Sequence, residues 1–203
     1  MANIIQPKGF VPSRYLNGSP YNGGTNLYCI PSTDGSMFSV GDAVTTVAGG
    51  DANGIPNVAK ATGTSTVRGV ITGVLPVGYN NPSLVGVNLD LTLQNVPATK
   101  TKAYYVLVAD DPNLLFEIMD DGAAALTATA CNKNAIFVVV NPTSPAQVSA
   151  STLSAASVAT TSTLNLKIMG LVQKPNNAFG INALWLVKFN LHELIGGAGS
   201  AGF

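Results

Sequence analysis

Five carboxylates gather in one short stretch, AYYVLVADDPNLLFEIMDDG, at residues 103–122. A paired-carboxylate hydrolase needs two acids held across a cleft, and a calcium loop needs acids at alternating positions around a glycine. Neither spacing is present, whereas Asp-Asp-Pro-Asn is typical of a turn because Asp and Asn side chains accept hydrogen bonds from nearby amides. We expect turns here, with an incidental ion site as the alternative and Glu117 on the wetter face of a strand. The five are Asp110, Asp111, Glu117, Asp120 and Asp121.

Nucleophilic and metal chemistry would depend on very few residues. His192 is the only histidine, so a Ser-His-Asp triad or a zinc site would rest on it, and its sequence context predicts a surface position at a strand end. Cys29 and Cys131 have no CxxC neighbour, and we expect free thiols in a reducing compartment. A GxGxxG match at residues 197–202 lacks the helix that the dinucleotide motif requires. We therefore expect no enzyme, no metal and no cofactor.

The overall charge excludes further classes of function. Charged residues make up 10% of the chain and cancel to zero net charge, against about 25% charged residues in typical soluble domains. Lys100 and Lys102 form the only local basic pair, so we expect no direct nucleic-acid partner. Apolar runs such as AIFVVV are far shorter than the ~18 residues of a membrane span, and no secretion signal is recognisable. The N-terminus therefore favours a protein made in the cytosol, and the low charge favours one that is packed among partners.

Strand patterns dominate the chain. Residues 87–94 and 164–168 alternate apolar and polar side chains, which indicates strands buried on one face. In residues 183–192 the same alternation predicts that Lys188, Asn190 and His192 lie opposite an apolar face. Residues 103–109 and 135–140 are apolar on both faces and should form central strands, while residues 68–75 hold Gly69 and Gly73 for a bulge or a close backbone approach. The expected apolar face of residues 183–192 comprises Trp185, Val187, Phe189 and Leu191.

The same patterns define the fold class. With 21 Gly and 12 Pro, turns are frequent and strands must be short. Only residues 122–131 suggest a short helix. We predict an all-β single domain, a sandwich or barrel, with little helix and extended terminal arms. The expected parts are an N-terminal arm over residues 1–25, an exposed Ser/Ala/Thr-rich loop over 143–163 and a flexible C-terminal tail over 196–203.

The opening MANIIQPKGFVPSRYLNGSPYNGGTNLYCIP resembles small tailed-phage virion proteins encoded beside the major capsid protein. Lys8-Gly9-Phe10 and the segment from Arg14 to Pro20 carry this resemblance. VGDAV, RGVITGV, YYVLVADDPNLLFEI and SVATTSTLNLKIMGLVQKPNNAFGINALWLV are similar to later blocks of those proteins. The resemblance extends to about His192 and departs at residues 143–154 and in the tail.

The resemblance implies a non-enzymatic capsid decoration or cement protein on the outside of an HK97-type shell. The expected partners are the major capsid protein and further copies of the chain, as a dimer or trimer. Candidate contact residues are Phe10, Arg14, Tyr15 and Phe203. The alternatives are a tail or neck component and a β-sandwich carbohydrate-binding module, which would need exposed aromatic side chains. The only tryptophan, Trp185, is expected in a core strand.

Overall fold

The computed structural model describes residues 3–75, 93–143, 148–196 and 199–203. These residues form β-strands joined by turns, with three short 3₁₀ helices and no α-helix in the described ranges, which confirms the all-β prediction. No helix in this part of the chain is long and apolar enough to cross a membrane. The expected strand over residues 87–94 lies almost entirely outside the described ranges.

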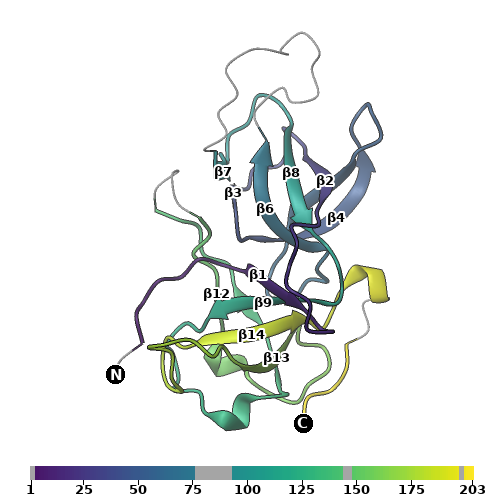
Figure 1. The fold of residues 1–203 in the computed structure, drawn as a ribbon. Coiled ribbons are helices and arrows are strands. Elements are labelled where there is room, and N and C mark those ends of the chain that lie inside the picture. The colour runs from purple at the N-terminus through teal and green to yellow at the C-terminus, as the bar shows by residue number, and fades with distance from the viewer. Residues whose placement is uncertain (1–2, 76–92, 144–147, 197–198) are drawn as a thin grey trace.

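Five strands close a small barrel in the order β2-β5-β4-β6-β8, drawn in the upper half of Figure 1. Tyr104–Ala109 lies between two neighbours, as predicted for a central strand. Val44, Ile71 and Val106 are fully buried inside and belong to one hydrophobic cluster. The strands are β2 (Asn26–Ile30), β4 (Ala43–Gly50), β5 (Pro56–Lys60), β6 (Gly69–Leu75) and β8 (Tyr104–Ala109).

A five-stranded antiparallel sheet in the order β1-β9-β14-β13-β10 forms the lower half of the molecule (Figure 1). The predicted apolar face of residues 183–192 is confirmed, because Trp185, Val187 and Phe189 are at most 2% exposed. They pack in a second and larger hydrophobic cluster. The strands are β1 (Val11–Tyr15), β9 (Leu114–Met119), β10 (Asn134–Ala135), β13 (Leu166–Leu171) and β14 (Leu184–Phe189).

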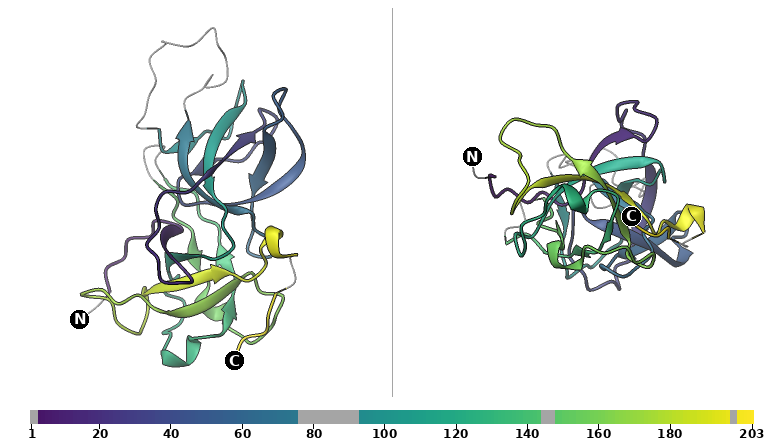
Figure 2. Two further views of the ribbon diagram at one scale, coloured as in Figure 1. Left: turned by 45° about the vertical axis from the view of Figure 1, so that its right-hand side comes forward. Right: turned by 90° about the horizontal axis from the view of Figure 1, so that it is seen from below.

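Short elements complete the fold. Two-residue strands form two small ladders, β3 with β7 and β11 with β12. They are β3 (Phe38–Ser39), β7 (Asn95–Val96), β11 (Phe137–Val138) and β12 (Thr152–Leu153). The 3₁₀ helices are η2 (Ala128–Ala130), η3 (Ala155–Ser157) and η4 (Glu193–Ile195). Figure 2 shows from two further sides that both chain ends lie with the sheet, away from the barrel.

The barrel and the sheet share one continuous stretch of chain. Strand β8 of the barrel leads directly into β9 of the sheet through Asp110–Asn113, which confirms the predicted corner. There the Asp111 carboxylate accepts the Asn113 amide at 2.7 Å, as expected for an Asp-rich turn. The five carboxylates therefore begin at the junction between the two halves.

Within the described part of residues 143–163, the segment 149–155 is packed into the molecule and is not exposed as expected. Ser149 and Leu153 are fully buried, and Ser151 is 2% exposed. The serine hydroxyls can be buried because they bond to each other and to the Asp42 carboxylate. Their small size also suits the site, since a Cβ at Gly9 would lie 2.6 Å from the Cβ of Ser149. The low hydrophobicity of this segment therefore reflects small side chains that allow close backbone packing, and not exposure to solvent.

Three further expectations need correction. Of the expected arm over residues 1–25, Val11–Tyr15 is an edge strand of the sheet. Residues 135–140 lie at sheet margins with Val138 and Val140 each 39% exposed, not in a central strand. The described part of the tail is bound to the body, because Gly202 donates to the Thr160 carbonyl and Phe203 to that of Asn132.

Candidate interface site

Asp110 forms a buried polar cluster at the junction of barrel and sheet. Its carboxylate accepts hydrogen bonds from the Tyr28 hydroxyl at 2.7 Å and from the Asn26 amide at 2.8 Å. The Arg68 guanidinium lies 3.4 Å from the same carboxylate and donates to the Tyr28 oxygen at 2.7 Å. Burial, and then the bond to Asp110, raises the pKa of Tyr28 to about 12. Each of these side chains is hydrogen-bonded or ion-paired to another member of the cluster. The cluster therefore stabilises the junction.

Asp120 organises the other end of β9. Its two oxygens accept four donors, the amides of Gly122, Asn182 and Ala183 at 2.7–2.9 Å and the Trp185 indole at 3.1 Å. The residue is fully buried. A carboxylate with so many donors needs no cation beside it, because charge-assisted hydrogen bonds replace its hydration. The predicted turn at Asp120-Asp121-Gly122 is thus confirmed, and it also fixes the loop before β14.

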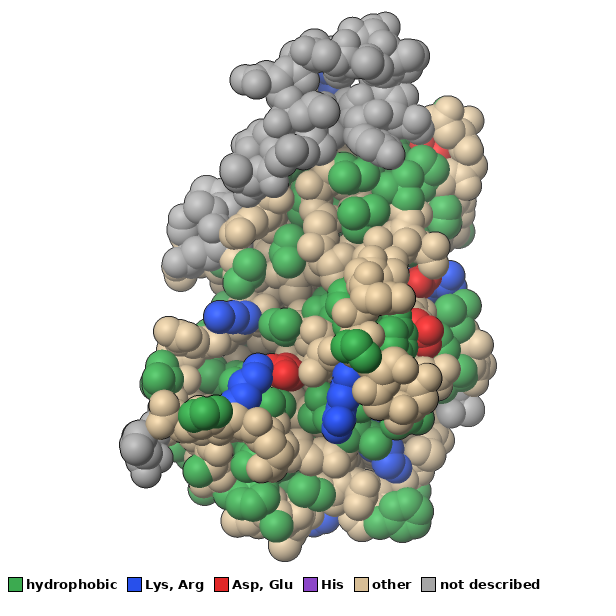
Figure 3. Space-filling view, in the orientation of Figure 1, with side chains coloured by type: hydrophobic (Ala, Val, Ile, Leu, Met, Phe, Trp, Pro, Cys, Tyr) green, Lys and Arg blue, Asp and Glu red, His purple; other side chains and the backbone are tan. Residues whose placement is uncertain are grey.

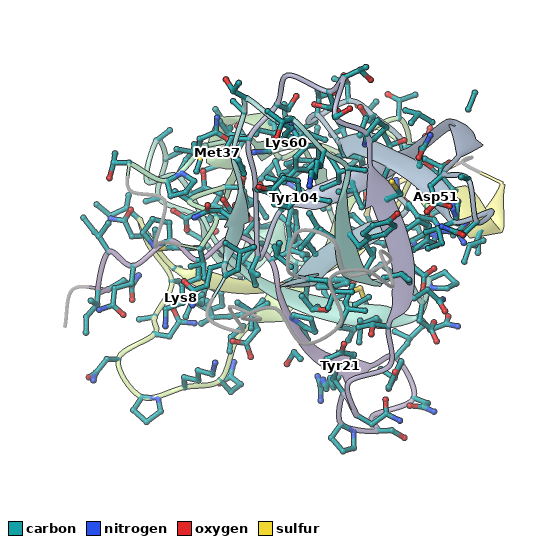
Figure 4. All side chains as sticks on the ribbon, turned by 90° about the horizontal axis from the view of Figure 1, so that it is seen from above. Lys8, Tyr21, Met37, Asp51, Lys60 and Tyr104 are labelled. Carbon is teal, nitrogen blue, oxygen red and sulfur yellow. The ribbon has the colours of Figure 1, made fainter. Side chains whose placement is uncertain are left out.

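A third buried carboxylate, Asp42, was missed by sequence reasoning. It accepts bonds from the Ser39 amide and the Lys60 amine, each at 2.8 Å. It also accepts the Ser149 hydroxyl at 2.6 Å. Lys60 bonds the Met37 carbonyl as well, and Figure 4 shows these two residues side by side on the barrel. Asp42 stands in an ordinary Gly-Asp turn sequence, so no local signal distinguishes it.

Within the described ranges, no group of three or more His, Cys, Asp or Glu side chains could hold a metal ion. Glu117 points to the outer side of the sheet, as expected, where it bonds the Ser13 hydroxyl and pairs with Lys174. Asp121 bonds two backbone amides. The described carboxylates of residues 103–122 therefore act as turn caps and as hydrogen-bond hubs.

His192 is buried, not on the surface as expected. It is 1% exposed, and its Nδ1 accepts the Leu194 amide at 3.1 Å, which caps η4. Burial, and then the nearby Arg68 charge, lowers the pKa of the imidazole. Asn190 is also buried, and its amide bonds the carbonyls of Ser162 and Leu164. Asn190 thus makes long-range bonds, which alternation cannot reveal, whereas His192 caps the short helix that follows it.

The four predicted contact residues separate into two groups. Phe10 is 1% exposed and its ring packs against Phe116, Phe137 and Phe189 at 5.1–6.1 Å. Phe10 therefore anchors the start of the chain inside the sheet's cluster. Tyr15 is partly buried against the same cluster. These two aromatic residues fix β1 in place, and only Tyr15 remains partly accessible.

Arg14 and Phe203 are exposed. Arg14 follows a bulge in β1 and lies opposite Leu115 of β9. Phe203 is 86% exposed, and the Lys167 amine lies 5.3 Å from its ring centroid. Trp185, by contrast, is fully buried, as expected, and cannot serve as a surface platform for a sugar.

The N-terminal arm forms a groove with the loop before β14. The Asn3 amide bonds the carbonyls of Ala178 and Ile181, and its oxygen accepts the Ala178 amide. Ile4 and Ile5 remain 63% and 68% exposed. The groove encloses about 280 Å³ between the arm and residues 174–177. The arm is thus held by polar bonds while its apolar side chains face outward.

No protein-family model, curated protein or solved structure matches this chain.

Proposed function

We propose that this chain is a structural virion protein that decorates the outside of a phage capsid and bridges neighbouring major capsid subunits. The observation that carries the proposal is the exposure of large apolar side chains at both ends of the chain. Ile4, Ile5 and Phe203 are 63–86% exposed, although the segments that carry them are hydrogen-bonded to loops beside the sheet. Apolar side chains fixed in place but facing outward are suited to burial by a partner.

The energetics of a shell agree with this proposal. Apolar burial stabilises by about 25 cal/mol per Å², and part of that gain is lost to association entropy. Because the segments are already fixed, less entropy is lost when a partner covers them. Repetition of one moderate contact over a closed shell makes the whole assembly strong.

Co-sedimentation with expanded shells of the cognate major capsid protein tests this function. Saturable binding at a fixed ratio, with shells that resist heat better, is the expected result. Phe203→Ala and Ile5→Ser should each weaken binding about tenfold. Val47→Ser replaces an apolar side chain of the barrel that is 40% exposed, and it should leave shell binding unchanged. Folded protein that never sediments with shells would refute the proposal and direct attention to a tail or neck position.

A further inference from the structure

The face of the five-stranded sheet that points away from the core is only partly covered. Leu166 and Ile168 on β13 and Val187 on β14 are fully buried. Their neighbours alternate to the other side of the sheet, which we call the outer face. Solvent reaches the apolar side chains there as well as the charged ones. The partly exposed residues of β13 and β14 on this face are Lys167, Met169, Leu184, Leu186 and Lys188. Leu171 lies on the core side, because the bulge after Ile168 places it opposite Trp185.

Three cations form a row across this face. Lys188 lies directly opposite Lys167 in the β13–β14 ladder. On the other side, the β9–β14 ladder includes the Val187–Phe116 pair, so Lys188 comes next to Leu115. Leu115 in turn pairs with Arg14 of β1. Arg14, Lys188 and Lys167 therefore follow one line perpendicular to the strands.

Among the residues that the structure describes, few carboxylates oppose this row. The outer face holds Glu117, and that group already pairs with Lys174. Asp42, Asp110 and Asp120 are buried in the bonds described above. The molecule as a whole has no net charge, yet its outer face carries a positive excess. Figure 3 shows the blue side chains gathered over the lower half of this view, among green ones.

The opposed lysines lower the stability of the isolated chain. Like charges directly opposite in an antiparallel pair repel at a Cβ separation of about 5 Å. Lys167 is partly accommodated, since its amine bonds the Ala201 carbonyl at 3.0 Å and lies over the Phe203 ring. An opposing anionic surface would relieve the repulsion. Leu184, Leu186 and Phe203 would at the same time supply apolar contact beside the charges.

We propose that the outer face, with Phe203 at its edge, docks onto an acidic protein surface whose carboxylates align with Arg14, Lys188 and Lys167. The identity of that partner as the capsid shell rests on the proposed function. A protein fits better than a nucleic acid because the row is short and lies beside leucines, whereas phosphate backbones reward denser positive charge. Complementary charge would give fast association that weakens with salt.

Charge reversal in the row, compared with reversal elsewhere, tests the proposal. Lys188→Glu and Arg14→Glu should each weaken shell binding at least tenfold and make it less sensitive to salt. Lys102→Glu, an exposed position on the barrel side of the molecule, should bind as the wild type does. Lys188→Glu should melt no lower than the wild type, because an attractive pair replaces a repulsive one. With its melting temperature maintained, a loss of shell binding by Lys188→Glu could not be attributed to unfolding.

The outcomes separate the two proposals. Shells that bind the wild type and both row variants equally would overturn the docking face and leave the decoration function intact. If the wild type does not bind shells, the docking face is tested by titration with a poly-glutamate peptide at low salt. The readout is the change in backbone amide chemical shifts. Shifts on β13 and β14 that disappear in Lys188→Glu support the docking face, and absent shifts overturn it. Tighter binding of a DNA duplex than of the peptide would also overturn it, in favour of nucleic acid.

Discussion

At the scale of single residues, this protein uses its carboxylates to hold backbone in place. Asp42, Asp110 and Asp120 are each buried and fully bonded, whereas Asp111 is an exposed turn cap. A buried donor that loses its acceptor costs about 1–3 kcal/mol. The contribution of each acid therefore depends on its burial and on how many donors it serves.

Asp120→Ala should destabilise the protein by about 4 kcal/mol, because four donors lose their acceptor together. Asp111→Ala, in the same stretch, is the matched control and should cost under about 1 kcal/mol. Urea unfolding measures both. Equal costs for the two variants would contradict the assignment of Asp120 as a hub.

His192 should make stability depend on pH. Its folded pKa lies below the ordinary value of 6.5, so the unfolded chain binds a proton first as the pH falls. Stability is therefore complete well above pH 6.5 and should decrease as the pH falls from 7 to 5.5. The charged groups that influence the imidazole are Arg68, Asp110, Asp111 and Glu193.

His192→Asn provides the comparison, because an Asn oxygen can accept the Leu194 amide without titrating in this range. Its urea-derived stability should be nearly constant from pH 7 to 5.5. A variant that keeps the slope of the wild type would show that other groups cause it.

At the scale of elements, glycine determines how the barrel closes. In the β6–β8 ladder the register shifts between Ile71 and Gly73, so the predicted bulge in this strand is confirmed. Gly69 instead satisfies the predicted close approach, since a Cβ there would lie 2.4 Å from the Ala109 carbonyl oxygen. The sequence indicated both possibilities but could not assign them, because the approaching backbone, at Ala109, lies forty residues further along the chain.

Gly69→Ala should cost about 3 kcal/mol or prevent folding, because a backbone oxygen cannot move aside for the new methyl group. Gly73→Ala is the control in the same strand. Its Cβ would meet Leu107 at 3.6 Å, an ordinary contact, and the change should stay within about 1 kcal/mol. Melting temperatures measured by circular dichroism would compare the two variants. A Gly73→Ala variant less stable than Gly69→Ala would refute the close approach at Gly69.

At the scale of the whole molecule, two hydrophobic clusters are coupled across one junction. Val67 and Val70, which flank the start of β6, belong to the sheet's cluster. Near the C-terminus the Glu193 carboxylate accepts three bonds from Thr45 and Thr46 of β4. Contacts this extensive favour unfolding of both halves as one cooperative unit.

Cooperativity can be measured with one probe in each half. Trp185 fluorescence reports the sheet, and thiol labelling of Cys29, 2% exposed in the barrel, reports the other half. A Cys131→Ser background removes the second, partly exposed thiol. The two urea midpoints should coincide. Labelling of Cys29 at lower urea would show that the barrel opens alone.

The sequence by itself determined the fold class, the apolar face of β14 and the turns at both acidic pairs. These features follow from local causes: side-chain alternation on a pleated strand and capping of nearby amides by Asp and Asn. The exposure of Arg14 agrees with its polar type in an edge strand.

Only the tertiary structure decided which polar residues are buried. Ser149, His192 and Asp42 have ordinary sequence contexts, yet all three are buried. Ser149 and Asp42 bond each other across distant segments, and the backbone of His192 pairs with the distant Val67. The tertiary structure also decided that Phe10 packs inside the molecule and that Arg14, Lys188 and Lys167 form one row. Strand order and register create such neighbours, and neither is encoded in local periodicity.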